Sequence, residues 1–359
     1  MKILFDATVF QQPFTGIAKS TLALYQACLA RMPKLEFTAL HQRPLTGALP
    51  SSFHAMRYGS ALPSVIWRKT VLPVMALSQR AGIIHFPWNG NVPALFSGAK
   101  VITTIHDVLP LIIPNYFKHE QAKRHYHRRI QRDISRSRVV FTVSEFSKTE
   151  ILKNFDIKTS PIVIRHAPTL SCARTSATSD DGDYFLYVGG YDLRKGLEAL
   201  LRVFLTLRHD RKLRSRLILT GSRHYFSDSF KRLVEQGTRA GVVEEKGYVS
   251  DELLGDLLSR AKGLVYPSKY EGFGLPPLEA MAAGCPVLTT RGTALPEICG
   301  DAALYVDPDN DSEFSVSLMR LESDSDLRQK LASAGRKQAT RFSWDASAQI
   351  FLDEVMNCE

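Results

Sequence analysis

Two glutamates eight positions apart, Glu271 and Glu279, frame a glycine- and proline-rich segment in the second half of the chain. The pair Pro276–Pro277 suits the first turn of a helix, where a missing N–H group costs no hydrogen bond. A helix start beside the turn at Gly272 and Gly274 would direct backbone N–H groups at an anion. The two carboxylates would instead accept hydrogen bonds from hydroxyl groups. The segment therefore predicts a site for a ligand that carries both phosphate and hydroxyl groups, as a sugar nucleotide does.

Two adjacent cations, Arg194 and Lys195, follow a second apolar run that ends in a glycine turn at Gly190. Cations at the start of a helix oppose the helix dipole, and a bound diphosphate would remove that conflict. Arginine can hold phosphate oxygens bidentately, whereas lysine acts as a point charge. The alternative is a pair of solvated cations.

Polar residues at the ends of apolar runs in the first half of the chain are further candidates. His106 and Asp107 follow the run 101–105, and His85 lies near the end of the run 82–86. An α/β protein places its chemistry at the carboxyl ends of its strands, which favours a functional role for these side chains. The alternative for His106 is a hydrogen-bonded histidine that caps a strand. A loop with Gly16 lies between a first predicted strand and a helix, and a tight turn is its alternative reading.

Length and composition narrow the class of protein. A chain of 359 residues exceeds the usual single core, so we expect two domains. No apolar run approaches the roughly 20 residues that span a bilayer. The five cysteines are scattered and lack the spacing of metal ligands, which favours reduced thiols and a cytoplasmic location. The net charge of +10 indicates anionic partners.

Residues 118–138 form a strongly basic segment with helical periodicity. Four apolar residues recur at every fourth position: Ala122, Tyr126, Ile130 and Ile134. Four arginines are offset from them by two positions and so lie on the opposite side of a helix: Arg124, Arg128, Arg132 and Arg136. This face is either solvated, or it meets an anionic membrane or a phosphate-bearing acceptor. Nucleic acid is not expected, because no recognised binding module accompanies the charge.

The string from Glu271 to Glu279, E-G-F-G-L-P-P-L-E, resembles the signature of the retaining glycosyltransferases of family 4. The resemblance extends over nearly the whole chain and is strongest over residues 184–308. It implies an α/β structure of the GT-B type, with two Rossmann-like domains that face a cleft and a C-terminal helix that crosses back to the first domain. The implied divisions are an acceptor-side domain (1–170), a linker (171–183), a nucleotide-sugar domain (184–341) and the terminal helix (342–359).

The same resemblance implies roles for individual residues. Glu279 would accept hydrogen bonds from the ribose, and Glu271 from the transferred sugar. His106 would contact that sugar, while Arg194 and Lys195 would bind the diphosphate. The other implied donor contacts are Gly16, Gly190, Tyr248, Val249, Phe273, Gly274 and Leu275. On the acceptor side the candidates are Asp107 and His85.

The implied reaction is the transfer of a sugar with retention of the anomeric configuration, by same-face substitution in which the leaving phosphate accepts the acceptor's proton. The nucleotide sugar is a co-substrate, and we expect neither a cofactor nor a metal ion. Our prediction is mannose from GDP-mannose, moved to a glycan or lipid-linked acceptor of bacterial surface polysaccharide such as lipopolysaccharide, at the inner face of the plasma membrane. The alternatives are a non-transferring enzyme such as a UDP-N-acetylglucosamine 2-epimerase, and a non-catalytic subunit of glycan assembly.

Overall fold

The computed structural model describes residues 1–11, 16–46, 49–59, 61–79, 81–89, 92–93, 99–170, 182–223 and 227–358. Apart from residues 182–183, the predicted linker lies outside these ranges. The chain divides into two compact units. One unit comprises Met1–His166 together with Ser343–Glu359, and the other comprises Ala167–Phe342.

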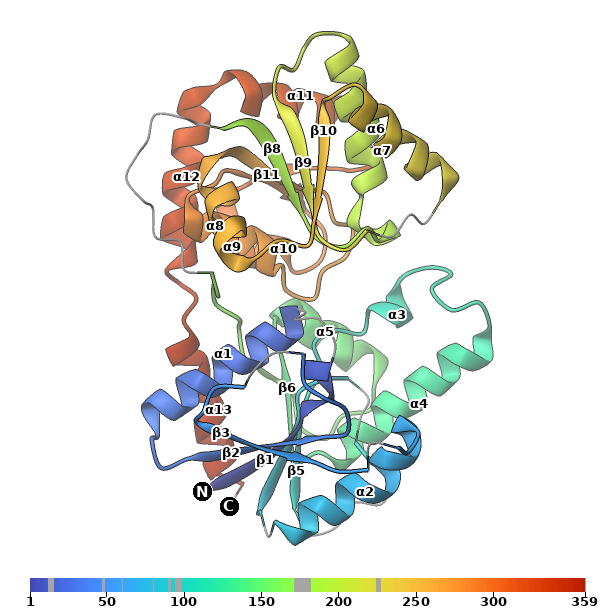
Figure 1. The fold of residues 1–359 in the computed structure, drawn as a ribbon, viewed down its shortest axis with the longest axis vertical. Coiled ribbons are helices and arrows are strands. Elements are labelled where there is room, and N and C mark those ends of the chain that lie inside the picture. Colours follow the sequence, from blue (N-terminus) through green and yellow to red (C-terminus); the bar gives the residue numbers. More distant parts are fainter. Residues whose placement is uncertain are drawn as a thin grey trace. The chain divides into compact units, whose positions relative to one another are not determined.

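A parallel sheet of seven strands forms the centre of the first unit, in the order β3-β2-β1-β4-β5-β6-β7 (Figure 1). Its strands are β1 (Lys2–Asp6), β2 (Glu36–His41), β3 (Phe53–Arg57), β4 (Ile83–Phe86), β5 (Lys100–Thr104), β6 (Val139–Thr142) and β7 (Ile162–Val163). The chain order reverses at β1, which pairs with β2 on one side and with β4 on the other. Ligands of such sheets bind outside the carboxyl ends of the strands at this switch point.

The helical elements of the first unit are η1 (Ala7–Gln11), α1 (Gly16–Arg31), α2 (Ser64–Ser78), α3 (Leu109–Ile112), α4 (Glu120–Arg136), α5 (Glu145–Asn154) and α13 (Trp344–Met356). Helix α13 begins after Ser343, whose hydroxyl accepts a hydrogen bond from the backbone N–H of Ala346 at 3.4 Å. It buries Phe351 and Val355 in the same core as β1 and α1. The predicted return of the C-terminal helix to the first unit is therefore confirmed.

The predicted basic helix is α4, but its apolar stripe is shorter than expected. Ile130 and Ile134 are buried, whereas Ala122 is exposed. The prediction for Ala122 is wrong because the first turns of α4 extend away from the sheet (Figure 1). Arg132 is half-buried, whereas the other three predicted surface arginines are exposed: Arg124, Arg128 and Arg136.

The second unit contains a parallel sheet of six strands in the order β10-β9-β8-β11-β12-β13. Its strands are β8 (Gly182–Val188), β9 (Arg216–Thr220), β10 (Val243–Gly247), β11 (Ala261–Tyr266), β12 (Val287–Thr290) and β13 (Leu304–Val306). Its helical elements are η2 (Leu193–Lys195), α6 (Leu197–His209), α7 (Asp228–Arg239), α8 (Asp251–Arg260), α9 (Leu275–Ala283), α10 (Leu295–Cys299), η3 (Gly300–Ala302), α11 (Asp311–Ser323) and α12 (Ser325–Ala339). The chain order reverses at β8, which pairs with β9 and with β11.

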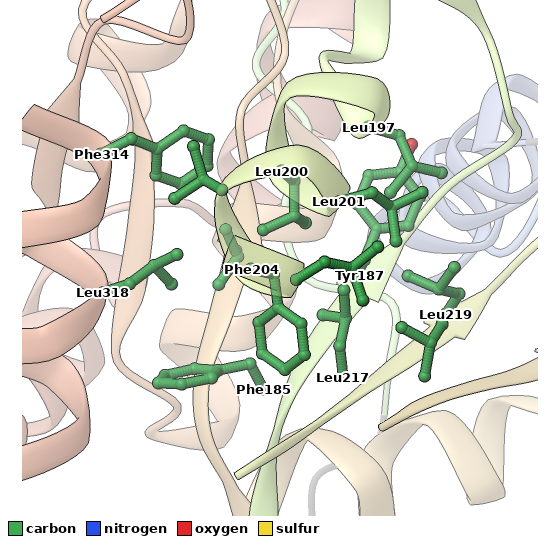
Figure 2. Close-up of a cluster of buried hydrophobic side chains, with 14 of the residues drawn as sticks. Phe185, Tyr187, Leu197, Leu200, Leu201, Phe204, Leu217, Leu219, Phe314 and Leu318 are labelled. Carbon is green, nitrogen blue, oxygen red and sulfur yellow. The ribbon is translucent and has the colours of Figure 1, made fainter. Parts of the chain in front are cut away.

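Helix α6 is fixed to this second sheet by an apolar cluster (Figure 2). Leu197, Leu200 and Phe204 project from α6 and are fully buried. They pack with Phe185 of β8, and the cluster extends to β9 and α11 through the residues Leu217, Leu219, Phe314 and Leu318. Because η2 directly precedes α6, this packing also fixes the position of the backbone that carries Arg194 and Lys195.

Candidate functional site

Charged residues meet at the point where the chain order of the second sheet reverses. Strands β8 and β11 are hydrogen-bonded neighbours. The segment after β8 carries Arg194 and Lys195, and the segment after β11 carries Glu271. The carboxyl ends of parallel strands lie at one edge of a sheet, so residues 76 positions apart in sequence come together there.

The carboxylate of Glu271 is the centre of this cluster. Its Oε1 atom lies 2.5 Å from Nζ of Lys195, and it accepts hydrogen bonds from Ser268 Oγ at 2.6 Å and Tyr266 OH at 2.8 Å. A guanidinium nitrogen of Arg194 lies 3.6 Å from the same oxygen. Within the described ranges, Oε2 takes part in no hydrogen bond, and the side chain keeps 11% of its surface exposed. One oxygen is thus held in place and the other is left to accept a hydrogen bond.

Lys195 and Glu271 form an ion pair, and the charge of each residue shifts the pKa of the other. Burial alone would favour a neutral Glu271, but Lys195 and Arg194 outweigh burial and hold the pKa of this carboxyl below its ordinary value. Burial lowers the pKa of Lys195, and Arg194 acts in the same direction, while the Glu271 charge opposes both. The ionised Glu271 carboxylate favours the charged form of the Lys195 ammonium. The site therefore presents fixed positive charge in a partly desolvated position, where electrostatic interactions are stronger than in water.

Hydrogen bonds to backbone carbonyls and a close backbone approach hold the segments after β8 and β11 together. Arg194 donates from Nη1 to the carbonyl of Tyr270 at 3.0 Å, and the N–H of Lys269 donates to the carbonyl of Arg194 at 2.7 Å. Gly196 has φ +66°, and a Cβ atom there would lie 2.1 Å from the carbonyl oxygen of Pro267. Only glycine allows this close approach.

Helix α9 begins beside the cluster, as the sequence predicts. Gly274 precedes it with φ +108°, and Gly284 ends it with φ +77°. Glu279 is buried inside the helix and accepts a hydrogen bond from Thr169 Oγ1 at 2.7 Å. Phe273 is also buried, and its ring lies 6.0 Å from that of Phe342. Phe273, Gly274 and Leu275 therefore lie at the helix N-terminus, where backbone N–H groups lack partners within the helix.

The remaining predicted donor residues of the second unit lie at the same edge of the sheet. Gly190 follows β8, and its carbonyl accepts a hydrogen bond from Tyr187 OH at 3.0 Å. Tyr248 and Val249 follow β10, where the ring of Tyr248 is 63% exposed. Their contact with a nucleobase stays a prediction.

In the first unit, His106 lies just beyond the end of β5 and is held in one orientation. Its Nε2 atom donates to the carbonyl of Pro87 at 2.9 Å, and its backbone N–H donates to Asn89 Oδ1 at 2.8 Å. A carbonyl can only accept, so Nε2 carries the proton and Nδ1 is an acceptor. Asn89 also donates to the carbonyl of Asp107 at 2.7 Å. Burial lowers the pKa of His106 to about 4, so the imidazole is neutral at neutral pH.

His85 lies inside the first unit, and its ring makes two hydrogen bonds. Nδ1 lies 2.6 Å from Tyr25 OH, and Nε2 lies 2.8 Å from Thr104 Oγ1. Burial lowers its pKa to about 3. This placement favours a structural role, and a role on the acceptor side stays a prediction. Gly16 is the first residue of α1, while residues 12–15 of its loop lie outside the described ranges.

The structure adds neighbours that sequence analysis missed. His166 lies 5.7 Å from His106, ring to ring, and stacks on Trp344. A cavity of about 20 Å³ is lined by these three residues and His85. Tyr266 and Ser268 lie five and three positions before Glu271, so their proximity in sequence was a usable signal. His166 and Trp344 are far apart in sequence and gave none.

The buried histidines predict acid sensitivity of the first unit. His106 and His85 have folded pKa values of about 4 and 3, against an ordinary value of 6.5. The unfolded chain thus binds protons first, so their contribution to stability is complete above pH 6.5 and falls as the pH drops toward 4. Between pH 7 and 5 we expect each histidine to remove about 2 kcal/mol from the free energy of unfolding.

Urea unfolding followed by tryptophan fluorescence measures this loss, because all three tryptophans belong to the first unit. The variant His106→Gln should lose about 2 kcal/mol less than the wild type over that interval. Equal losses in the two proteins would contradict a neutral, buried His106.

Among the described residues, no group of three or more His, Cys, Asp or Glu side chains is arranged to hold a metal ion. The same part of the chain contains no helix with the length and apolar character needed to cross a membrane.

Comparison with known proteins adds sequence relationships to this geometry. The family model described as "Glycosyl transferases group 1" matches residues 173–338. The chain is 30% identical over 374 residues to O-antigen chain mannosyltransferase B of Escherichia coli, in a match that covers 96% of this chain and 97% of the relative. It is also 22% identical over 279 residues to the serotype-specific mannosyltransferase WbdA of Escherichia coli, which covers 73% of this chain but only 34% of that longer protein.

Solved structures share the fold at lower identity. Sucrose-phosphate synthase from Thermosynechococcus elongatus superposes with a TM-score of 0.77 at 18% identity, covering 99% of this chain and 98% of that one. HepE from Anabaena, in complex with UDP and glucose, gives a TM-score of 0.75 at 17% identity, covering 99% and 100%. These likenesses and the two parallel sheets confirm the predicted α/β fold of the GT-B type with two Rossmann-like units.

Proposed function

Because the chain belongs to the group 1 glycosyltransferases, we propose that it transfers mannose from GDP-mannose to a bacterial surface glycan with retention of configuration. The observation that carries the proposal is the convergence of Lys195, Arg194 and Glu271 at the switch point of the second sheet. Paired cations suit a diphosphate, and a carboxylate suits sugar hydroxyls. The choice of mannose rests on the two relatives, both named mannosyltransferases.

The proposed roles follow from the contacts of each side chain. Lys195 and Arg194 bind the diphosphate of the donor while Glu271 keeps them in place. Oε2 of Glu271 accepts a hydrogen bond from a hydroxyl of the transferred sugar, because Oε1 is already occupied. Glu279 accepts hydrogen bonds from the ribose, in addition to or in place of the Thr169 hydroxyl. Contact between His106 and the transferred sugar stays a prediction.

The proposed mechanism uses positioned charge. Cleavage of the glycosidic bond to the leaving phosphate places developing negative charge on the diphosphate. Lys195, Arg194 and the N-terminus of α9 stabilise that charge, and such fixed electrostatics is usually the largest catalytic term. The acceptor hydroxyl attacks from the face that the diphosphate leaves, and a phosphate oxygen takes its proton. The glycan or lipid-linked acceptor binds at the inner face of the plasma membrane in this proposal.

Family membership favours this reading over a UDP-N-acetylglucosamine 2-epimerase. The charged cluster also argues against a non-catalytic subunit, because an unused site has no reason to keep a buried ion pair that burial alone destabilises. Turnover of a sugar nucleotide without any acceptor would favour the epimerase.

A panel of nucleotide sugars tests the donor by thermal unfolding. At a concentration of GDP-mannose 100 times its Kd we expect about 2.7 kcal/mol of added stability, or a rise in Tm of roughly 5–10 °C. UDP-glucose, ADP-glucose and dTDP-rhamnose at equal concentration should give smaller shifts, and free mannose serves as the control. A larger shift with UDP-glucose would replace the proposed donor. The anomeric configuration of the product, read by NMR with a mannose-terminated oligosaccharide acceptor, tests retention.

A further inference from the structure

The last residue of β11, Tyr266, places its phenol hydroxyl between the Lys195 ammonium and the Glu271 carboxylate. Nζ of Lys195 lies 2.7 Å from Tyr266 OH, and this hydroxyl lies 2.8 Å from Oε1 of Glu271. The ammonium nitrogen also lies 5.0 Å from the centre of the Tyr266 ring. An ammonium group can only donate hydrogen bonds, and an ionised carboxylate can only accept them. The hydroxyl therefore accepts from Lys195 and donates to Glu271.

Burial fixes the position of the Tyr266 side chain. Only 1% of this residue is exposed, and its ring stacks on that of Tyr187 with the ring centres 6.5 Å apart. A buried tyrosine needs a partner for its hydroxyl, and one backbone carbonyl is sufficient, as for Tyr184, which donates to the carbonyl of Leu257 at 2.8 Å. The hydroxyl of Tyr266 instead contacts two charged side chains of the candidate site. Filling the core therefore does not account for this hydroxyl.

The two contacts of Tyr266 determine which hydrogen-bonding groups remain for a ligand. A lysine ammonium has three N–H groups, and those of Lys195 that reach Tyr266 OH and Oε1 of Glu271 leave one more. Because both partners are buried, they fix the direction of that remaining N–H. On the carboxylate, Tyr266 and Ser268 both donate to Oε1, so the side chain is held with its other oxygen, Oε2, turned away from them. Electrostatic catalysis requires donors and charges that are oriented before the reaction begins.

We propose that Tyr266 is a positioning residue of the transferase site, whose hydroxyl directs the Lys195 ammonium at the donor diphosphate and Oε2 of Glu271 at the transferred sugar. The inference rests on the proposed function, which assigns Lys195 and Glu271 to the donor. Tyr266 acts through these two residues and does not touch the donor, because it is almost fully buried. Its hydroxyl keeps its proton throughout, since burial and the Glu271 charge raise the pKa of Tyr266 well above its ordinary value.

Steady-state kinetics of Tyr266→Phe, with the donor that the nucleotide-sugar panel selects, provides the first test. Phenylalanine keeps the ring beside the ammonium and removes only the hydroxyl. We expect kcat to fall about 10- to 100-fold, the effect of losing a hydrogen bond to a charged group. KM for the donor should change less than about threefold, because both charged side chains remain. The matched control is Tyr184→Phe, which removes another buried hydroxyl of the second unit and should have wild-type kinetics.

The pH profile of kcat/KM separates positioning from a loss of packing. The Tyr266 hydroxyl stabilises the charged forms of both partners, so its removal lowers the pKa of Lys195 and raises the pKa of Glu271. Activity is lost as the pH rises through the first pKa and as it falls through the second. The pH interval of full activity should therefore narrow by about 0.5 to 1 unit on each side in Tyr266→Phe. A packing defect lowers kcat/KM equally at every pH, so an unchanged profile overturns the proposal whether or not kcat falls.

A double-mutant cycle measures the contact without any substrate. Urea unfolding of Tyr266→Phe, Lys195→Met and the double variant should show a combined loss of stability smaller than the sum of the single losses, because the hydroxyl has no ammonium to hold once Lys195 is replaced. Additive losses would overturn the proposal, and this result can be read even if the proposed function fails. Conversely, an inactive Lys195→Met beside a Tyr266→Phe enzyme with wild-type kinetics would exclude Tyr266 and leave the proposed function standing.

Discussion

Lys195→Met should lower kcat/KM for sugar transfer by about 1,000-fold, since removal of one preorganised charge from an active site costs about 10² to 10³ in rate. Methionine keeps the apolar length of the side chain but removes the charge that lies 2.5 Å from Glu271. The diphosphate would then lose a buried cation while Arg194 alone remains. Steady-state kinetics with the donor from the nucleotide-sugar panel provides the measurement, and binding of GDP alone should weaken in parallel.

Loss of stability must be separated from loss of catalysis in this variant. Glu271 would keep a buried charge without its main partner, which costs about 3–5 kcal/mol. The double variant Lys195→Met/Glu271→Gln removes both charges and should recover much of that stability without recovering activity. Lys262→Met is the matched control, because Lys262 is also largely buried and ion-paired, to Asp183 at 2.8 Å. A folded Lys195→Met enzyme with near wild-type kcat/KM would remove Lys195 from the proposed site.

Phe204→Ala should destabilise the second unit by about 3–5 kcal/mol, the usual cost of deleting a buried aromatic side chain. Phe204 is fully buried where α6 packs on the sheet (Figure 2). The total stability of a typical domain is only about 5–15 kcal/mol, so this loss is a large share of it. Urea unfolding followed by circular dichroism measures the change, while tryptophan fluorescence follows the first unit separately.

Thr206→Ala is the control for this change on the same helix. Thr206 is exposed, and its hydroxyl donates a hydrogen bond to the carbonyl of Arg202 in the same helix. We expect it to change stability by no more than about 0.5 kcal/mol. If Phe204→Ala cost as little as that, the packing of α6 would not be what fixes η2.

The local structure of the site could be predicted from the sequence, but the contacts between its separate segments could not. The glycine turn, the two prolines and the stop at Gly284 follow from backbone chemistry, and α9 has the predicted form. The meeting of Lys195 with Glu271 depends on β8 lying next to β11, although β9 and β10 come between them in the chain. Strand order is set by packing over the whole sheet, so the sequence around Lys195 or Glu271 alone does not predict that the two residues form a pair.

The spacing of apolar residues in a helix likewise did not predict which of them are exposed. In α4 the spacing of apolar residues indicated the buried side, but it could not show where the sheet stops covering the helix, which is why Ala122 is exposed. In α2 apolar residues occupy both faces, so periodicity alone cannot separate a core face from an exposed one. The fold buries Trp67 and leaves its sequence neighbour Ile66 exposed.

The placement of α13 has a consequence for synthesis of the protein. During synthesis, residues 167–342 emerge from the ribosome before Trp344–Met356. The core around β1, however, contains Phe351 and Val355 of that last helix. The second unit can therefore complete its core while the first unit, although made earlier, still exposes the apolar side chains that α13 covers. The part of the chain that is made first is the last to close, and until then its unfinished core is open to chaperones and proteases.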